Sequence, residues 1–192
     1  MIKLGITGGI GSGKSLLSKY LRCRNIPVYD TDAHAKLLMV ADLSLREALK
    51  ELLGESAYIS NQLNKEYIAS CIFSDRSLLK KVNAIVHPVV KQDFIHWADK
   101  QNKSIVAMEC AILFEADFSS SVDYIIQVSA PEELRISRVV KRDAQLYKDI
   151  QSRVKNQMSD SERKKLADFE IINNDSIAVI PQIESILNKL SQ

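Results

Sequence analysis

Residues 2–15 read IKLGITGGIGSGKS, and this stretch decides the fold. Its first half, Ile2 to Thr7, is a short apolar run of the kind that forms a buried parallel strand. Its second half, Gly8 to Ser15, fits the pattern G-x-x-x-x-G-K-[ST], and leucines at helical spacing follow it. A strand, a glycine-rich loop and a helix in this order predict a loop that binds the phosphates of a nucleotide.

The residue types in this loop suit that chemistry. Backbone N–H groups can surround a triphosphate only if the chain wraps closely around it, and side chains would obstruct the wrap. The loop also enters a helix N-terminus, whose partial positive charge favours an anion. Lys14 can reach the β- and γ-phosphates, and the Ser15 hydroxyl can ligate Mg²⁺. The expected ATP-binding residues of the loop are Gly9, Gly11, Ser12, Gly13, Lys14, Ser15 and Leu16. The alternative, a glycine-rich turn with no ligand, is disfavoured by the flanking strand and helix.

The rest of the chain continues the alternation of strands and helices. Further short strands are expected at residues 26–30, 104–109, 122–129 and 169–173, and residues 131–166 have a densely charged helical pattern. Residues 33–101 read as helical throughout, which is too much helix for one crossover and predicts a helical insertion. Pro181 marks either the first turn or a kink of the last helix. We therefore expect one α/β domain over residues 1–192, a doubly wound parallel sheet of about five strands with the insertion at about 33–101.

Composition narrows the function classes. The chain has 192 residues and a net charge of only +2, so no large basic field indicates a nucleic-acid or membrane partner. Its three cysteines lie far apart and are expected to be reduced. No apolar run approaches membrane-spanning length, and no signal peptide precedes the first strand. These features predict a cytoplasmic protein without an obligate protein partner.

A second group of polar residues, Asp30-Thr31-Asp32, ends the second expected strand. Residues two apart on a strand share a face, so both carboxylates can point the same way, into the crevice at the strand ends. A kinase acting on an alcohol needs a carboxylate to orient the hydroxyl and accept its proton. The alternative is that both residues only cap the next helix, and the local pattern leaves the two readings about equal.

Five segments together resemble the dephospho-coenzyme A kinase family: ITGGIGSGKS, VYDTD, IVHPVV, AILFE and SRVVKRD. The resemblance runs from Ile2 to about Asn174, with the motifs in family order. It implies a P-loop kinase that uses ATP with Mg²⁺ to phosphorylate the ribose 3′-hydroxyl of dephospho-coenzyme A, the last step of coenzyme A synthesis. It also implies a lid over about residues 138–166. In the family pattern, Glu109 stands where Asp is common, which weakens its assignment as a metal ligand.

The resemblance assigns roles to individual residues. Asp32 matches the family's candidate base, and Asp30 its companion on the substrate. His87 and Pro88 match a pair in the helical region that covers the coenzyme A substrate. Arg138 and Arg142 match the arginines that flank the lid near ATP, and Asn173 matches a position near the nucleotide base. The catalytic set is then Asp32, Lys14 and Arg142, with most other basic residues between 135 and 165 on a solvated helix face.

Three other classes compete with this interpretation. Another small-molecule P-loop kinase, for a nucleoside or a nucleotide, shares every general feature. A regulatory GTPase needs a base-reading N-K-x-D sequence, and the chain has none. A P-loop ATPase that drives a nucleic-acid machine should have a more basic surface.

Overall fold

The computed structural model describes residues 1–143, 147, 150–151, 154 and 157–191. The chain forms two compact units, which are described separately: residues Met1–Tyr29 with Gln101–Gln192, and residues Asp30–Lys100. Within the described residues, no helix is long and apolar enough to cross a membrane.

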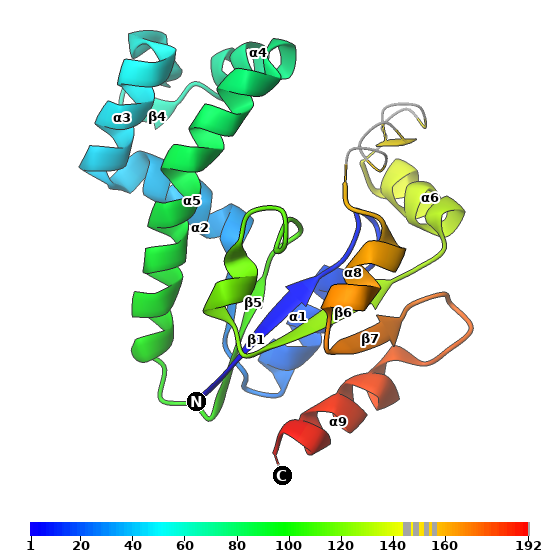
Figure 1. Ribbon diagram of the computed structural model, residues 1–192. Coiled ribbons are helices and arrows are strands. Elements are labelled where there is room, and N and C mark those ends of the chain that lie inside the picture. The colour runs from blue at the N-terminus through cyan, green and yellow to red at the C-terminus, as the bar shows by residue number, and fades with distance from the viewer. Residues whose placement is uncertain (144–146, 148–149, 152–153, 155–156, 192) are drawn as a thin grey trace. The chain divides into compact units, whose positions relative to one another are not determined.

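A five-stranded sheet forms the centre of the first unit (Figure 1). The strands are β1 (Ile2–Thr7), β2 (Val28–Asp30), β5 (Ile105–Glu109), β6 (Tyr124–Ser129) and β7 (Phe169–Ile172). Their spatial order is β2-β5-β1-β6-β7, and β1 pairs in parallel with both β5 and β6. The chain thus starts in the middle of the sheet and adds strands on both sides. The predicted α/β class with a doubly wound parallel sheet is confirmed.

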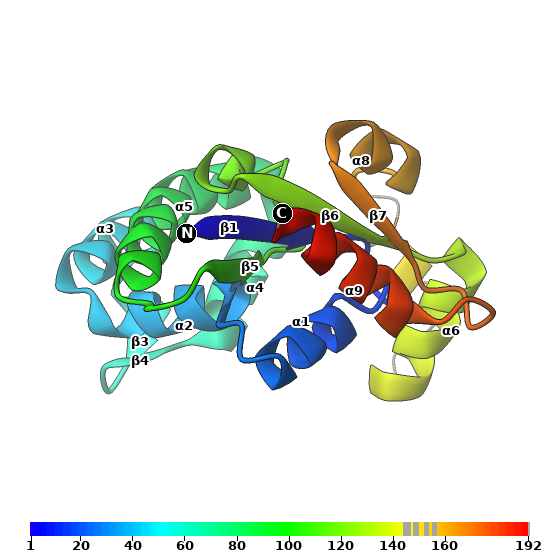
Figure 2. The ribbon, with the colours of Figure 1, turned by 90° about the horizontal axis from the view of Figure 1, so that it is seen from below.

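One large core cluster of this unit lies on one face of the sheet. Leu4 and Ile6 of β1 alternate onto that face and are fully buried. Helices α1 (Lys14–Cys23) and α9 (Val179–Leu190) cover it, as Figure 2 shows, and contribute Leu17 and Ile183 to the same cluster. Pro181 is the third residue of α9 and lies in its first turn, where a missing N–H costs nothing. This packing fixes the end of β1 and the start of α1, and therefore the loop between them.

Two more helices of the first unit lie near that loop. They are α6 (Glu132–Asp143) and α8 (Asp160–Leu166), and α8 begins with a capping box in which Ser159 and Glu162 exchange hydrogen bonds. A short helix η2 (Phe118–Ser121) follows β5. The expected lid over residues 138–166 falls partly outside the described residues, and α8 forms its described end.

The second unit is mainly helical. It contains α2 (Thr31–Ala41), α3 (Leu43–Leu53), η1 (Glu55–Ala57), α4 (Lys65–Ser74) and α5 (Arg76–Asp99). Asp42 and Asp75 cap α3 and α5 by accepting hydrogen bonds from backbone N–H groups. Its core is formed mainly by buried apolar residues of α3 and α5, among them Leu49 and Phe94.

The expectation that residues 33–101 are helical throughout is wrong over residues 58–63. A small hairpin of β3 (Tyr58–Ile59) and β4 (Gln62–Leu63) interrupts it. Ser60 and Asn61 form its turn with φ of +48° and +64°, the conformation that a two-residue hairpin loop requires. Strands of two residues are too short to show an alternating pattern in the sequence.

Candidate active site

The phosphate-binding loop depends on glycine at two positions for reasons of space as well as conformation. Gly11 has φ +77° and Gly13 has φ +101°, both in the region that favours glycine. A Cβ on Gly11 would lie 2.3 Å from the carbonyl oxygen of Arg135, and a Cβ on Gly13 would lie 2.2 Å from Nδ2 of Asn173. The loop is therefore packed from behind by α6 and by the end of β7, which holds it in its wrapped shape.

The N-terminus of α1 is open to an anion. Gly13 is its N-cap and supplies no side-chain hydrogen bond, and the first turn contains no acidic residue. Ser15 and Leu16 are exposed there. The N–H groups at the start of α1 and the helix dipole together favour a phosphate at this end.

The Lys14 ammonium lies across the loop. Its Nζ donates to the carbonyl oxygens of Gly8, at 2.8 Å, and Gly9, at 3.3 Å. These two contacts bring the charge over the glycine loop itself, which is where the β- and γ-phosphates of a bound nucleotide have to lie.

Asn173 and Arg138 connect the loop to the end of β7. The Nδ2 of Asn173, a buried side chain, donates to the carbonyl oxygen of Ser12 at 2.8 Å. Arg138 donates to the carbonyl oxygen of Asn173 at 3.1 Å, and more weakly to that of Gly11 at 3.5 Å. Its guanidinium also pairs with Asp175 at 2.5 Å. The structure thus brings together four of the residues expected at the ATP site.

Arg142 points elsewhere. It forms a bidentate pair with its neighbour Asp143, with N–O distances of 2.6 and 2.7 Å, and 63% of its side chain is exposed. The hydrogen bonds that Arg142 donates to Asp143 raise the pKa of its guanidinium. Among the described contacts, none joins Arg142 to the loop, and its role toward ATP stays a prediction.

Most other basic residues of this region were expected on a solvated face, and Arg135 and Arg163 are exceptions because both are buried. Arg135 is 6% exposed: its Nη1 covers Gly9, and its Nε lies 3.8 Å from the carboxylate of Asp160. Arg163 is fully buried and pairs with Asp160, at 3.2 Å, and with Glu115, at 3.4 Å. The sequence held one indication that Arg135 is buried. It is four residues before Val139 and therefore lies on the same, buried side of α6.

The two aspartates do not share a strand face. The helix α2 starts at Thr31, so Asp30 ends the strand and Asp32 belongs to the first helical turn. The argument from strand alternation is therefore wrong. The Asp30 side chain accepts from the N–H of Ala33 at 3.0 Å and caps α2. Asp32 is exposed and has no hydrogen-bond or ion-pair partner in the described part of the chain, so its carboxylate is available to a substrate.

His87 and Pro88 lie in the interior of α5, which continues through the proline. His87 is partly buried, and burial lowers the pKa of its imidazole below the ordinary value. The ring is therefore neutral at pH 7. The structure places His87 inside a continuous helix, and its contact with the substrate stays a prediction.

The described residues suit a metal ion held mainly by ATP. Within them no three His, Cys, Asp or Glu side chains come together as a metal cluster. Mg²⁺ usually keeps several waters and binds nucleotide phosphates through one or two protein oxygens. The exposed Ser15 hydroxyl at the start of α1 fits that need.

The sheet, the loop and the open helix end define a P-loop kinase. Known proteins with the same architecture include a shikimate kinase from Acinetobacter baumannii, with a TM-score of 0.59 at 13% identity, which shows the fold alone. It covers 99% of this chain and 93% of that one.

Closer comparisons give the family. The sequence model of the dephospho-CoA kinase family matches residues 2–179. A dephospho-CoA kinase from Bacteroides fragilis is 42% identical over 192 residues, which are 100% of this chain and 94% of that protein. The crystal structure of a Thermus thermophilus protein has a TM-score of 0.83 at 31% identity and covers 98% of this chain and 95% of that one. The chain belongs to the dephospho-CoA kinase family, which confirms the resemblance drawn from the motifs.

Proposed function

We propose that this protein transfers the γ-phosphoryl group of ATP to the ribose 3′-hydroxyl of dephospho-coenzyme A, in the cytoplasm, and so completes coenzyme A. The observation that carries the proposal is the phosphate-binding loop, with Lys14 held across it, in a chain that the family model matches over residues 2–179. A nucleoside or nucleotide kinase, the alternative left open by the loop alone, is not favoured by the family match.

The loop binds the donor. Backbone N–H groups of the loop and of the start of α1 bind the phosphates, and Lys14 neutralises charge on the transferring group. The Ser15 hydroxyl would hold Mg²⁺ together with the nucleotide, and the metal would neutralise charge on the phosphates. Asn173 and Arg138 keep the loop wrapped, as their contacts with Ser12 and Gly11 indicate.

Asp32 is the proposed base. It is exposed and unpaired within the described chain, and it directly follows the carboxyl end of β2. Ligands of doubly wound sheets bind at the carboxyl ends of the strands. Asp32 orients the 3′-hydroxyl and takes its proton as the phosphoryl group leaves ATP. Because the transition state is loose, positioning and charge neutralisation outweigh the strength of the base.

Arg142 is proposed to leave Asp143 for a phosphate oxygen when ATP is bound. The Asp143 carboxylate and a phosphate group can replace each other as partners of Arg142, because each accepts two parallel hydrogen bonds from a guanidinium. The exchange costs little at a side chain that is 63% exposed, since a surface ion pair contributes only about 0–1 kcal/mol.

The test is an acceptor screen. ADP release is measured with ATP, Mg²⁺ and, in turn, dephospho-coenzyme A, adenosine, deoxyadenosine and nucleoside monophosphates. We expect kcat/KM for dephospho-coenzyme A to exceed every other value by orders of magnitude. A higher kcat/KM for a nucleoside or nucleotide would overturn the proposal.

A further inference from the structure

Four charged side chains meet beside the start of α8, within the first unit. They are Arg135 of α6, Glu115, which follows β5, and Asp160 and Arg163 of α8. Arg163 is fully buried, and Arg135 is nearly so. Guanidinium groups are rarely buried without acidic partners, and here two carboxylates balance two positive charges. The cluster is therefore a fixed part of the fold and not a surface ion pair.

Asp160 is the carboxylate that both arginines share. Its Oδ1 accepts from Nη1 of Arg163 at 3.2 Å, and its Oδ2 lies 3.8 Å from Nε of Arg135. Its backbone carbonyl accepts from Nε2 of Gln127, a buried side chain of β6, at 2.9 Å. The sheet thus holds the backbone of Asp160, Arg163 holds one carboxylate oxygen, and the other oxygen sets the place of Arg135.

The cluster reaches the phosphate-binding loop at Gly9. A Cβ on Gly9 would overlap Nη1 of Arg135 and would lie 3.5 Å from Oδ1 of Asp160. Gly9 is not one of the residues with positive φ, so the need for glycine there is one of space. The guanidinium occupies the volume of a side chain, and the ion pair therefore touches the loop directly.

A second contact reaches the next residue of the loop. Oε1 of Gln157, three residues before Asp160, accepts from the N–H of Ile10 at 2.9 Å. The same peptide unit carries the carbonyl oxygen of Gly9, which accepts from Nζ of Lys14 at 3.3 Å. One peptide unit thus lies between Gln157 on one side and the Lys14 ammonium on the other. Rotation of this unit would move an oxygen to which Lys14 donates.

We propose that Gln157 and Asp160 are positioning residues for ATP. Gln157 acts directly on this peptide unit, and Asp160 acts through Arg135, which covers its first residue. Together they hold the peptide in the orientation that places the Lys14 ammonium over the loop, where it neutralises charge on the transferring phosphoryl group. The inference rests on the proposed function for the identity of the donor, and it adds residues that the pattern of the loop does not contain.

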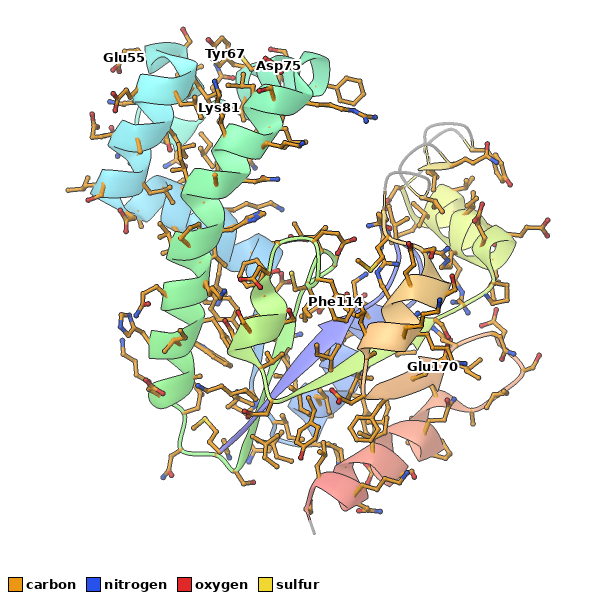
Figure 3. All side chains as sticks on the ribbon, viewed as in Figure 1. Glu55, Tyr67, Asp75, Lys81, Phe114 and Glu170 are labelled. Carbon is orange, nitrogen blue, oxygen red and sulfur yellow. The ribbon has the colours of Figure 1, made fainter. Side chains whose placement is uncertain are left out.

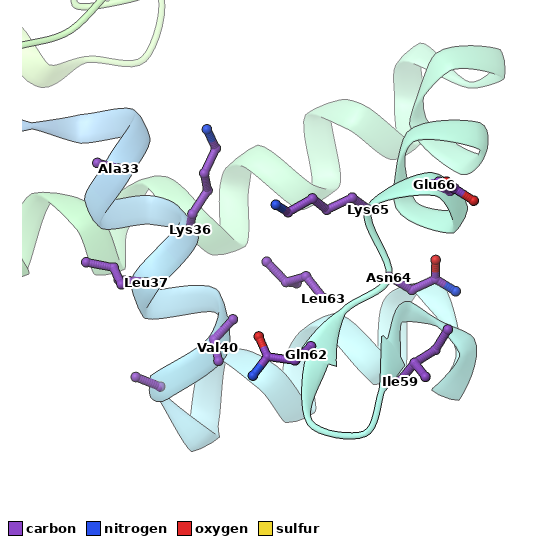
Figure 4. Close-up of a pocket in the computed structure, with 11 residues that line it drawn as sticks. Ala33, Lys36, Leu37, Val40, Ile59, Gln62, Leu63, Asn64, Lys65 and Glu66 are labelled. Carbon is purple, nitrogen blue, oxygen red and sulfur yellow. The ribbon is translucent and has the colours of Figure 1, made fainter.

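The effect should appear on the ATP side of the reaction. All of these residues belong to the first unit. Figure 4 shows the groove of the second unit, between α2, the β3–β4 hairpin and the start of α4, and none of them lines it. Because their contacts are with the phosphate-binding loop, we expect their substitution to change ATP binding and turnover, with KM for dephospho-coenzyme A unchanged.

Gln157→Met tests the direct contact. Methionine removes the acceptor at similar side-chain length and leaves the charged cluster intact, so the fold should survive. Calorimetry measures Kd for ATP and for inorganic tripolyphosphate, which carries the phosphates without the nucleoside. We expect both Kd values to rise by the same factor, about 2- to 10-fold, as for one lost hydrogen bond. Turnover should fall as well, because Lys14 acts on the transferring group in the transition state.

Arg135→Met and Asp160→Asn test the path through the ion pair. Arg135→Met leaves Asp160 paired with Arg163, so it strands no positive charge in the interior. Each variant should raise Kd for ATP and for tripolyphosphate about 10-fold. In the double variant, Asp160→Asn should add nothing to the effect of Arg135→Met, because Asp160 acts through Arg135.

Glu170→Gln is the matched control. Glu170 also pairs with a basic residue of α8, Lys164, at 2.7 Å, but it lies on β7 (Figure 3). This variant should bind ATP as the wild type does. The free energy of unfolding in urea is measured for every variant. A merely structural role would lower that free energy while the folded protein kept its affinity for ATP.

Failure of this proposal differs from failure of the proposed function. Wild-type protein that binds ATP but does not phosphorylate dephospho-coenzyme A would overturn the proposed function, and the binding measurements would still decide the positioning roles. An unchanged Kd in Gln157→Met, relative to Glu170→Gln, would overturn the role of Gln157. An unchanged Kd in Arg135→Met, or additive losses in its double variant with Asp160→Asn, would overturn the role of Asp160.

Discussion

A methyl group at Gly13 tests whether the packing behind the phosphate-binding loop matters for ATP binding. Gly13 has φ +101°, and a Cβ there would lie 2.2 Å from Nδ2 of Asn173. That same nitrogen donates to the carbonyl oxygen of Ser12 at 2.8 Å. Gly13→Ala therefore strains the backbone and also displaces the amide that holds the loop.

The magnitude follows from these two effects. A non-glycine residue in this region of φ costs about 1–3 kcal/mol. A lost neutral hydrogen bond adds about 0.5–1.5 kcal/mol. If the whole sum, roughly 1.5–4.5 kcal/mol, opposes the ATP-binding shape of the loop, kcat/KM for ATP falls about 10- to 10³-fold.

The assay measures kcat/KM for ATP and the free energy of unfolding in urea. Gly54→Ala is the matched control, because Gly54 has φ +89° but a Cβ there would meet only the Tyr67 hydroxyl, at 3.7 Å. It should lose stability without losing ATP affinity. In the double variant with Asn173→Ala the clash is absent. The loss of kcat/KM in the double variant should therefore be smaller than the sum of the losses in the two single variants. An unchanged kcat/KM for ATP in Gly13→Ala, or additivity within about 0.5 kcal/mol, would refute the reasoning.

Three further predictions concern single side chains. Asp32→Asn should lower turnover by roughly two to three orders of magnitude with ATP binding little changed. Asp30→Asn should lower turnover less, because asparagine also caps a helix. If Asp30→Asn lowered turnover more than Asp32→Asn, the roles of the two residues would be exchanged. Arg142→Ala should reduce turnover and ATP affinity more than acceptor affinity, with stability unchanged at this exposed residue, and a loss confined to acceptor binding would place Arg142 in the other site. Burial lowers the pKa of His87, so the unfolded chain binds more protons than the folded one as pH falls below about 6.5, and the free energy of unfolding should decrease there. His87→Gln should show a smaller decrease of this free energy, measured by urea unfolding. Equal decreases in the variant and the wild type would contradict the prediction.

The sequence predicted the sheet and the phosphate-binding loop because both depend on local patterns. Apolar runs mark β1 and β6, and the loop has a glycine-rich sequence pattern that a backbone wrapped closely around a phosphate requires. The loop's packing was not predictable in this way. Gly13 contacts Asn173, which is far away in the chain, and no local pattern carries such a contact.

The errors have physical causes as well. Most basic residues near Arg135 were expected on a solvated face because charged side chains are usually exposed, but Arg135 is buried and lies 3.8 Å from the carboxylate of Asp160. The hairpin at Tyr58–Leu63 is too short for periodicity.

The most direct test of the central claim is the identity of the product. Purified protein is incubated with ATP, Mg²⁺ and dephospho-coenzyme A, and the product is identified by mass and by ³¹P NMR, with Lys14→Ala as the control that assigns the activity to this protein. The account predicts coenzyme A, phosphorylated at the ribose 3′-hydroxyl, together with one ADP per product, and almost none from Lys14→Ala. Release of ADP and inorganic phosphate without a phosphorylated acceptor, or a phosphate on any other hydroxyl, would contradict it.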